Sequence, residues 1–187
     1  MSMYRAGIAG LGMIGGADPV SAKAIGQSVS DMDGTHFSAL SGNDRISIVA
    51  GSSRDPGRRE RFAIRSDGAT VYASLQDMLD HEQLDLLSIA TYAPAHEEAA
   101  IAAIASGVKV IYCEKPIAQT VSAGQRIVDA CDQKGILLVV NHQRRFSSGY
   151  RKLSALVSGG KLGHIASAYA QWSNCLLYTS PSPRDRG

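Results

Sequence analysis

The chain alternates short apolar runs with longer amphipathic stretches. Runs of about 4–8 apolar residues rich in Val and Ile are typical of buried strands, in a sheet whose two faces are both covered. One such run leads into Gly10, and the others predict strands over 46–50, 84–90, 108–113 and 136–140.

The stretches between these runs predict helices. Ser74 and Asp77 have the form of a capping box at the start of a short helix. Longer helices are expected over 94–106 and 120–134, and each is followed by a glycine that can end it. This alternation predicts an α/β fold, a Rossmann-like doubly wound parallel sheet, with ligands at the carboxyl ends of its strands.

Three glycines follow the first predicted strand at the spacing G-x-G-x-x-G, namely Gly10, Gly12 and Gly15. Gly10 would make the turn, Gly12 would admit a dinucleotide pyrophosphate, and Gly15 would let the next element pack closely. Together with Met13 and Ile14 they form the predicted cofactor-binding turn. An ordinary glycine-rich turn is the alternative, because the chain contains 19 glycines.

The stretch after Gly15 departs from the simplest dinucleotide-binding unit. Asp18 and Pro19 predict a helix start, with Asp18 as N-cap and Pro19 at the first helical position. Apolar positions are loosely helical over 20–32, and a second short helical piece is expected at 37–40. We interpret this stretch as an insertion, so that the helix begins late and its N-terminus does not point squarely at the phosphates.

The second predicted strand leads into Ser53 and Arg54, with no carboxylate before Asp55. At this edge an acidic residue would accept the ribose 2′-hydroxyl of NAD, whereas an arginine accommodates the 2′-phosphate of NADP. The sequence therefore favours NADP over NAD. The alternative is that the arginines of this stretch only form the solvated face of the next helix; they are Arg54, Arg58, Arg59 and Arg61.

Three further loops follow predicted strands at the same edge: Thr91 to His96, Glu114-Lys115-Pro116, and 141–146. Glu-Lys-Pro directly after an apolar strand resembles the strand-Glu-Lys-Pro-helix arrangement of the glucose-fructose oxidoreductase, inositol dehydrogenase and rhizopine-catabolism family (Gfo/Idh/MocA). The first loop is similar to the family's Thr-Pro-x-x-x-His stretch, although its proline comes later. The third loop, with Arg-Phe at its end, also looks like the family. The resemblance covers about residues 4–172.

The resemblance implies roles for the residues of these loops. Lys115 would lie between nicotinamide and substrate as the catalytic residue. Its ammonium could hydrogen-bond a hydroxyl and favour ionisation of that hydroxyl as hydride leaves the same carbon. Glu114 would orient the ribose or the lysine. Thr91, Tyr92 and Pro94 would line the cofactor.

Other polar residues of the loops have two interpretations each. His96 is either a cofactor neighbour or a capping or packing histidine. Gln143 and Arg145 would reach the nicotinamide amide or a substrate oxygen, but an arginine in this place can also serve as an interdomain ion-pair partner. His142 lies immediately beside this edge, where it could act as an acid or base, but a structural role is favoured.

The resemblance also sets the expected domains. An NAD(P)-binding Rossmann domain would span 1–146, and 147–174 would begin a truncated α+β domain that carries the family's substrate pocket and its proton-accepting histidine. Within that part we expect a helix over 150–158 and a strand over 165–172. Residues 175–187, rich in Pro, Ser and Arg, predict a disordered or non-native tail. A native unstructured C-terminus is the alternative.

Composition narrows the class of protein. The net charge is +2, with 19% charged and 44% hydrophobic residues in a chain of 187. These values are typical of a soluble globular protein, and they predict no nucleic-acid partner. The three cysteines lack the spacing of a metal or redox site, so we expect no metal and a reducing, cytoplasmic compartment. We expect neither an export signal nor a membrane span.

With the resemblance, these features imply the cofactor-binding part of an NADP- or NAD-dependent oxidoreductase. It would transfer hydride between nicotinamide and a sugar, cyclitol or related polyol. The full-length form is expected to be a homo-oligomer, and this chain alone to bind cofactor weakly and turn over poorly. Two alternatives stay open: a non-catalytic dinucleotide-sensing regulatory protein, and an inactive fragment.

Overall fold

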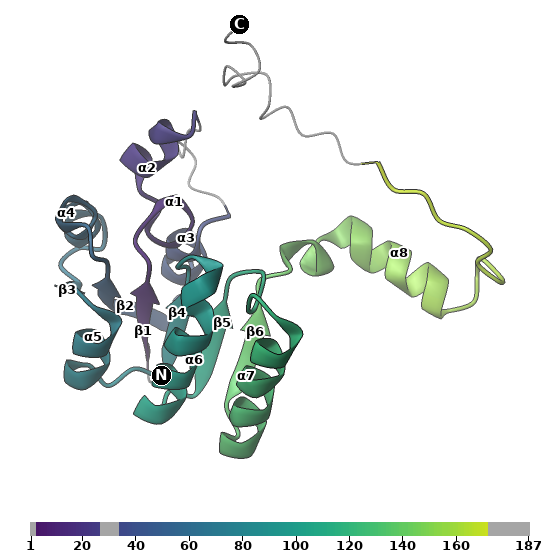
Figure 1. Ribbon diagram of the computed structural model, residues 1–187. Coiled ribbons are helices and arrows are strands. Elements are labelled where there is room, and N and C mark those ends of the chain that lie inside the picture. Colours follow the sequence, from purple (N-terminus) through teal and green to yellow (C-terminus); the bar gives the residue numbers. More distant parts are fainter. Residues whose placement is uncertain (1–2, 27–33, 172–187) are drawn as a thin grey trace, which may run out of the picture. The chain divides into compact units, whose positions relative to one another are not determined.

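The computed structural model describes residues 3–26 and 34–171. The chain divides into two compact units, 1–141 and 142–187. The first contains a six-stranded parallel sheet with the order β3-β2-β1-β4-β5-β6, which is the doubly wound arrangement (Figure 1). Its strands are β1 (Tyr4–Ala9), β2 (Ile46–Ser52), β3 (Thr70–Tyr72), β4 (Leu86–Ile89), β5 (Val110–Cys113) and β6 (Leu137–Val140).

Helices cover the two faces of this sheet. Their bounds are α1 (Met13–Gly16), α2 (Pro19–Ala24), α3 (His36–Ser41), α4 (Pro56–Arg65), α5 (Leu75–His81), η1 (Ala93–Ala95), α6 (His96–Ser106) and α7 (Val121–Lys134). One apolar cluster lies between the sheet and α5, α6 and α7, and the other between the sheet and α3 and α4. Burial on both faces explains why the strands are apolar runs rather than alternating ones.

The predicted helix ends are confirmed by the backbone. Gly107 and Gly135 follow α6 and α7 with φ of 84° and 66°, in the left-handed region that favours glycine. Ser74 caps α5 by accepting a hydrogen bond from the N–H of Asp77 at 3.0 Å. The start of α5 and the ends of α6 and α7 therefore lie where the sequence predicts them.

Two features near the start of the chain differ from the expectations. A one-turn helix, α1, begins at Met13, directly after Gly12, so the expectation of a late helix start is wrong. Ala17 ends α1 in the left-handed conformation, with φ of 52°. Asp18 and Pro19 then begin α2, as predicted, and residues 27–32 of the expected helical stretch lie outside the described residues. Strand β3 was not expected because three residues are too short to show a pattern.

The second unit, taken by itself, contains η2 (Gln143–Phe146) and α8 (Ser148–Ser158). The strand expected over 165–172 is wrong for 165–171, which form neither helix nor strand. A strand needs a partner for its backbone hydrogen bonds, and the described residues of this unit, 142–171, contain no other strand. Residues 175–187 lie outside the described part, so the tail stays a prediction.

Candidate functional site

The glycine turn connects β1 to α1, and the structure itself requires two of its glycines. Gly10 has φ of 96°, and a Cβ built on it would lie 2.6 Å from the carbonyl oxygen of Ala90. A Cβ on Gly15 would lie 1.9 Å from the carbonyl oxygen of Gly10. These glycines therefore let β1, α1 and the end of β4 approach closely, which agrees with the roles expected of them.

Gly12 differs from its neighbours because nothing in the fold requires a glycine there. Its φ of −79° and ψ of −162° suit any residue. A Cβ on it would meet only one atom within 4 Å, Nη1 of Arg58 at 3.8 Å. A glycine with free space on its side-chain face fits a close approach by a ligand, and a dinucleotide pyrophosphate is such a ligand. Met13 and the exposed Ile14 follow it in α1.

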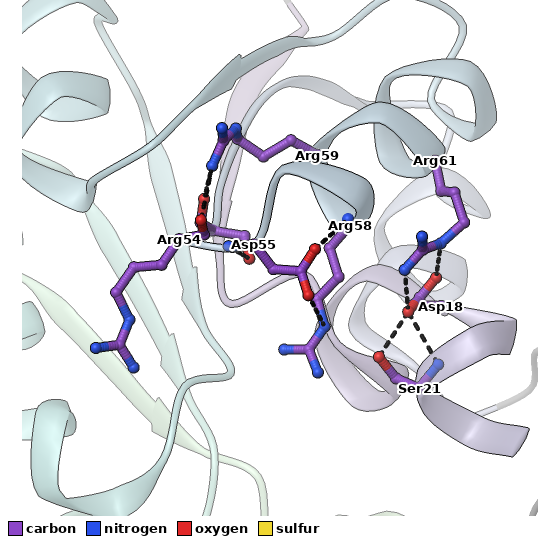
Figure 2. A network of polar contacts seen from close by, with 8 residues as sticks. Asp18, Ser21, Arg54, Asp55, Arg58, Arg59 and Arg61 are labelled. Atoms are coloured by element: carbon purple, nitrogen blue, oxygen red, sulfur yellow. Dashed lines mark hydrogen bonds and ion pairs between the residues drawn. The ribbon is translucent and has the colours of Figure 1, made fainter. Parts of the chain in front are cut away.

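The arginines after β2 divide into two groups (Figure 2). Arg59 donates to the carbonyl oxygens of Ser53 and Arg54 at 2.6 and 3.1 Å, and so holds the loop in shape. Arg61 donates hydrogen bonds from Nε and Nη2 to the two carboxylate oxygens of Asp18, at 2.6 and 2.9 Å. The interpretation of these two as merely solvated residues is therefore wrong. Their guanidinium groups already have protein partners.

Asp18 is buried, yet it stays ionised. Burial alone would raise its pKa, but hydrogen bonds from Arg61 and Ser21 outweigh burial and lower the pKa to about 2. The same carboxylate caps α2 through the N–H of Ser21 at 3.0 Å. One buried charge thus ties the start of α2 to α4.

Arg54 and Arg58 make weaker contacts. Arg54 is exposed, and within residues 3–26 and 34–171 no polar partner is recorded for its guanidinium. Arg58 has only a 3.8 Å ion pair with the exposed Asp55, and it lies beside Gly12. These two guanidinium groups are available to an anion at the edge of the sheet.

His96 joins the loops after β4 and β5. Its side chain is buried, with Nδ1 2.8 Å from the carbonyl oxygen of Pro116 and Nε2 3.0 Å from that of Thr91. This geometry favours the packing interpretation over direct cofactor contact. Pro94, in η1, and the exposed Tyr92 lie in the loop that His96 holds.

The hydroxyl of Thr91 is buried, and no hydrogen-bond partner is found for it in the described part of the chain. An orphaned buried hydroxyl is costly unless a ligand or water bonds it. It follows β4, next to the turn at Gly10. The site therefore fits a dinucleotide: a free glycine face, available guanidinium groups and an orphaned hydroxyl lie along one edge of the sheet.

Glu114 is the centre of a partly buried polar cluster after β5. Its Oε1 accepts hydrogen bonds from Nε2 of His36 at 2.9 Å and Nδ2 of Asn141 at 2.6 Å. Its Oε2 accepts from the backbone N–H of Lys115 at 3.1 Å. Burial would raise the pKa of Glu114, but these bonds lower it to about 2. Glu114 thus contacts the main chain of the lysine loop, and its two expected roles, orienting the ribose or the lysine, stay predictions.

Lys115 itself is exposed, and its peptide bond to Pro116 is cis. No ion pair of its ammonium is recorded with any residue that the structure describes. The main chain of this loop is thus held from both sides, by Glu114 and by His96 at Pro116. The ammonium is left to solvent or ligand.

Sequence reasoning missed His36. His36 lies in an apparent insertion, and its partner Glu114 is 78 residues away. No local sequence pattern therefore indicates that His36 belongs to the site. The nearest clue is Thr35, whose side chain caps α3. Cys113 is buried, and burial raises the pKa of its thiol to about 12. No group of three metal-binding side chains occurs among the described residues.

Gln143 and Arg145 lie in η2, and His142 lies just before it, in the second unit. All three are exposed in that unit. Their contact with a cofactor stays a prediction. None of the helices in residues 3–26 and 34–171 has the length and apolar character that crossing a membrane would need.

A family model described as "Oxidoreductase family, NAD-binding Rossmann fold" (GFO_IDH_MocA) matches residues 4–142. Inositol 2-dehydrogenase of Azotobacter vinelandii is 37% identical over 97 residues, which are 51% of this chain and 28% of that protein. Inositol 2-dehydrogenase of Pseudomonas fluorescens is 36% identical over 118 residues, or 62% of this chain and 35% of that protein. The chain thus spans about a third of these relatives.

Solved structures show the same fold. The WlbA dehydrogenase of Bordetella pertussis, in complex with NADH and UDP-GlcNAcA, has a TM-score of 0.72 and 25% identity. This match covers 88% of the chain and 42% of that protein. Scyllo-inositol dehydrogenase of Lactobacillus casei, with NAD(H) and scyllo-inositol, has a TM-score of 0.71 and 21% identity, with coverages of 88% and 43%. At that identity the second likeness shows the fold alone.

Proposed function

Since the chain belongs to the Gfo/Idh/MocA oxidoreductase family with an NAD-binding Rossmann fold, we propose that it is the cofactor-binding part of an NAD(P)-dependent oxidoreductase. The reaction is hydride transfer between nicotinamide and a carbon bearing a hydroxyl in a sugar, cyclitol or related polyol. The observation that carries this proposal is the exposed Lys115 ammonium on a loop that Glu114 and His96 hold at the cofactor edge. The names of the inositol 2-dehydrogenase relatives support a cyclitol.

In this mechanism the cofactor supplies the hydride chemistry, and the protein supplies orientation and electrostatics. The face of Gly12 receives the pyrophosphate, and the hydroxyl of Thr91 bonds a polar group of the cofactor. The ammonium of Lys115 donates a hydrogen bond to the substrate oxygen. As the hydroxyl proton passes to the proton-accepting histidine expected of the family's substrate domain, the ammonium would stabilise the alkoxide, which becomes the carbonyl when hydride leaves its carbon for the cofactor. In the reverse direction it would stabilise the negative charge that grows on this oxygen as the C–H bond forms.

For the choice of cofactor we propose NADP, through Arg54 and the loop at Ser53. Support comes from the exposed guanidinium of Arg54, while Arg59 and Arg61 are already engaged within the protein. Arg58, beside Gly12, adds a second positive charge on this side. NAD is the second candidate, because the solved relatives named above were determined with NADH or NAD(H).

The test is a titration of the chain with NADPH and with NADH, followed by fluorescence or calorimetry. Cofactor binding is measured rather than turnover, because the chain spans less than half of its solved relatives. Arg54→Ala is expected to weaken NADPH binding about tenfold and leave NADH binding unchanged, because one charge-assisted contact to the 2′-phosphate is lost. Equal effects on both cofactors would contradict the proposed role of Arg54.

Arg45→Ala is the matched control. It removes the same charge just before the opposite end of β2, where Arg45 bonds the hydroxyl of Tyr4. It is expected to leave both dissociation constants unchanged. If the wild-type chain binds neither NADPH nor NADH, the proposed function is wrong.

A further inference from the structure

His36, at the start of α3, contacts two strands of the sheet, β4 and β5, and is linked through Glu114 to the end of β6. Its side chain is 1% exposed. Nδ1 lies 2.5 Å from the hydroxyl of Ser88 in β4, and Nε2 lies 2.9 Å from Oε1 of Glu114, just after β5. The ring of Tyr112 packs against it at a centroid distance of 4.7 Å. Asn141, just after β6, bonds the same oxygen of Glu114.

The order Ser88, His36, Glu114 resembles a nucleophile with its base and carboxylate, but it does not suit nucleophilic catalysis. Ser88 is 0% exposed in the middle of the sheet, so no substrate can reach its hydroxyl. These hydrogen bonds instead hold the imidazole and the Glu114 carboxylate in place. Glu114 is ionised and only accepts, so Nε2 of His36 donates to it. In that tautomer Nδ1 carries no proton, and it accepts a hydrogen bond from the hydroxyl of Ser88.

This cluster affects the second carboxylate oxygen of Glu114, Oε2, which faces Lys115. With Oε1 occupied by His36 and Asn141, the carboxylate cannot turn, and Oε2 faces the backbone N–H of Lys115 at 3.1 Å. A fixed acceptor holds that N–H in one place, and a catalytic group must be held to within about 0.5 Å to be effective.

We propose that His36 is a positioning residue: it bonds Ser88 on one side and Glu114 on the other, and so fixes the carboxylate that holds Lys115. The proposal rests on the proposed function, in which the Lys115 ammonium meets the substrate. In this proposal α3, which follows the apparent insertion, serves to place His36 beside Glu114. The insertion is anchored at its start by Asp18 and Arg61 and returns the chain to the sheet with His36 at the first position of α3.

The experiment compares His36→Gln with His36→Asn in the full chain. A glutamine amide can reach the position of Nε2 and donate to Glu114, whereas an asparagine amide reaches only the position of Nδ1, toward Ser88. The readout is hydrogen exchange of the Lys115 backbone amide, compared with the amide of Ile111 inside β5. Dissociation constants for NADPH and NADH are measured beside it.

We expect exchange at Lys115 to accelerate roughly three- to tenfold in His36→Asn, as one modest hydrogen bond predicts, and less than about twofold in His36→Gln. The Ile111 amide is expected to exchange as in the wild type in both. Phe37→Leu is the control for α3, because it loosens packing against Phe62 without touching Glu114. Unchanged exchange at Lys115 in His36→Asn, or equal acceleration in both variants, would overturn the proposal.

A second variant keeps the test valid if His36→Asn unfolds the sheet and the Ile111 amide loses its protection. Ser88→Ala removes the bond that holds the imidazole while keeping His36 itself, and the Lys115 amide should then exchange faster with Ile111 unchanged. No acceleration there would also overturn the proposal. The cofactor titrations separate the two claims. If the wild type binds neither cofactor, the proposed function fails while the exchange data still decide the role of His36.

Discussion

The cofactor edge of the sheet is held in two different ways at its two ends. Beside β2, arginines of α4 reach across the surface to carbonyl oxygens and to Asp18, with their guanidinium groups partly in solvent. Beside β5, the partly buried Glu114 is held by His36, Asn141 and the N–H of Lys115. At the first end, long arginine side chains partly in solvent hold the loop after β2 and the buried Asp18. At the second end, the buried His36 and the partly buried Asn141 hold the partly buried Glu114.

The two ends should therefore differ in how much a substitution costs. A surface ion pair is screened by water and contributes little. A buried donor that loses its acceptor costs much more, because water cannot replace the partner. We therefore expect the β5 end to set stability and the orientation of Lys115, and the exposed arginines at the β2 end to set the affinity and choice of cofactor.

The largest effect on folding is expected from Gly15→Ala, because its Cβ would overlap the carbonyl oxygen of Gly10 at 1.9 Å. Backbone must move to relieve a contact this short. We expect the free energy of unfolding to fall by about 3 kcal/mol or more. Urea denaturation measures it, and a variant as stable as the wild type would contradict the close packing of α1 on β1.

The next effect is expected from Glu114→Gln, which replaces an ionised acceptor by an amide. The free energy of unfolding at pH 7 should fall by about 2 kcal/mol. The pKa of Glu114 is lowered from 4.5 to about 2, so its stabilisation is present above pH 4.5 and is lost as the pH falls toward 2. Denaturation across this range should show the difference between wild type and variant shrinking. If the difference in free energy of unfolding stays constant over this pH range, Glu114 does not stabilise the fold as a carboxylate.

A smaller effect is expected from Arg61→Ala, which leaves the buried carboxylate of Asp18 without its main partner. We expect a loss of about 1–2 kcal/mol in urea denaturation, since Ser21 still bonds the carboxylate. Arg58→Ala is the matched control, because its 3.8 Å pair with Asp55 is exposed and should contribute less than about 0.5 kcal/mol. Equal losses in the two variants would show that burial of Asp18 does not matter.

The sheet could be predicted because each buried strand is an apolar run, and the ends of α5, α6 and α7 because Ser74, Gly107 and Gly135 act locally. The glycine turn and the Glu114-Lys115 loop could be placed at one edge by the order of elements alone. Features that depend on distant partners could not. Strand β3 is defined by pairing with β2, and His36 is defined by Glu114, far along the chain.

The strand expected over 165–172 is absent from 165–171, again because strand formation depends on a distant partner. Its residues have suitable local preference, but β structure needs a partner strand, and 142–171 supply none. Similarly, nothing local showed that Arg59 and Arg61 bind within the protein while Arg54 stays available. Local sequence thus fixes elements and their ends more readily than it fixes partners.

The most direct test of the central claim is cofactor titration of Gly12→Ala. The fold has space for this Cβ, with only Arg58 Nη1 nearby at 3.8 Å, so the free energy of unfolding should match the wild type. If a pyrophosphate lies against Gly12, the affinity for both NADPH and NADH should fall at least about tenfold. A stable Gly12→Ala variant that binds both cofactors as tightly as the wild type would contradict the proposed cofactor site.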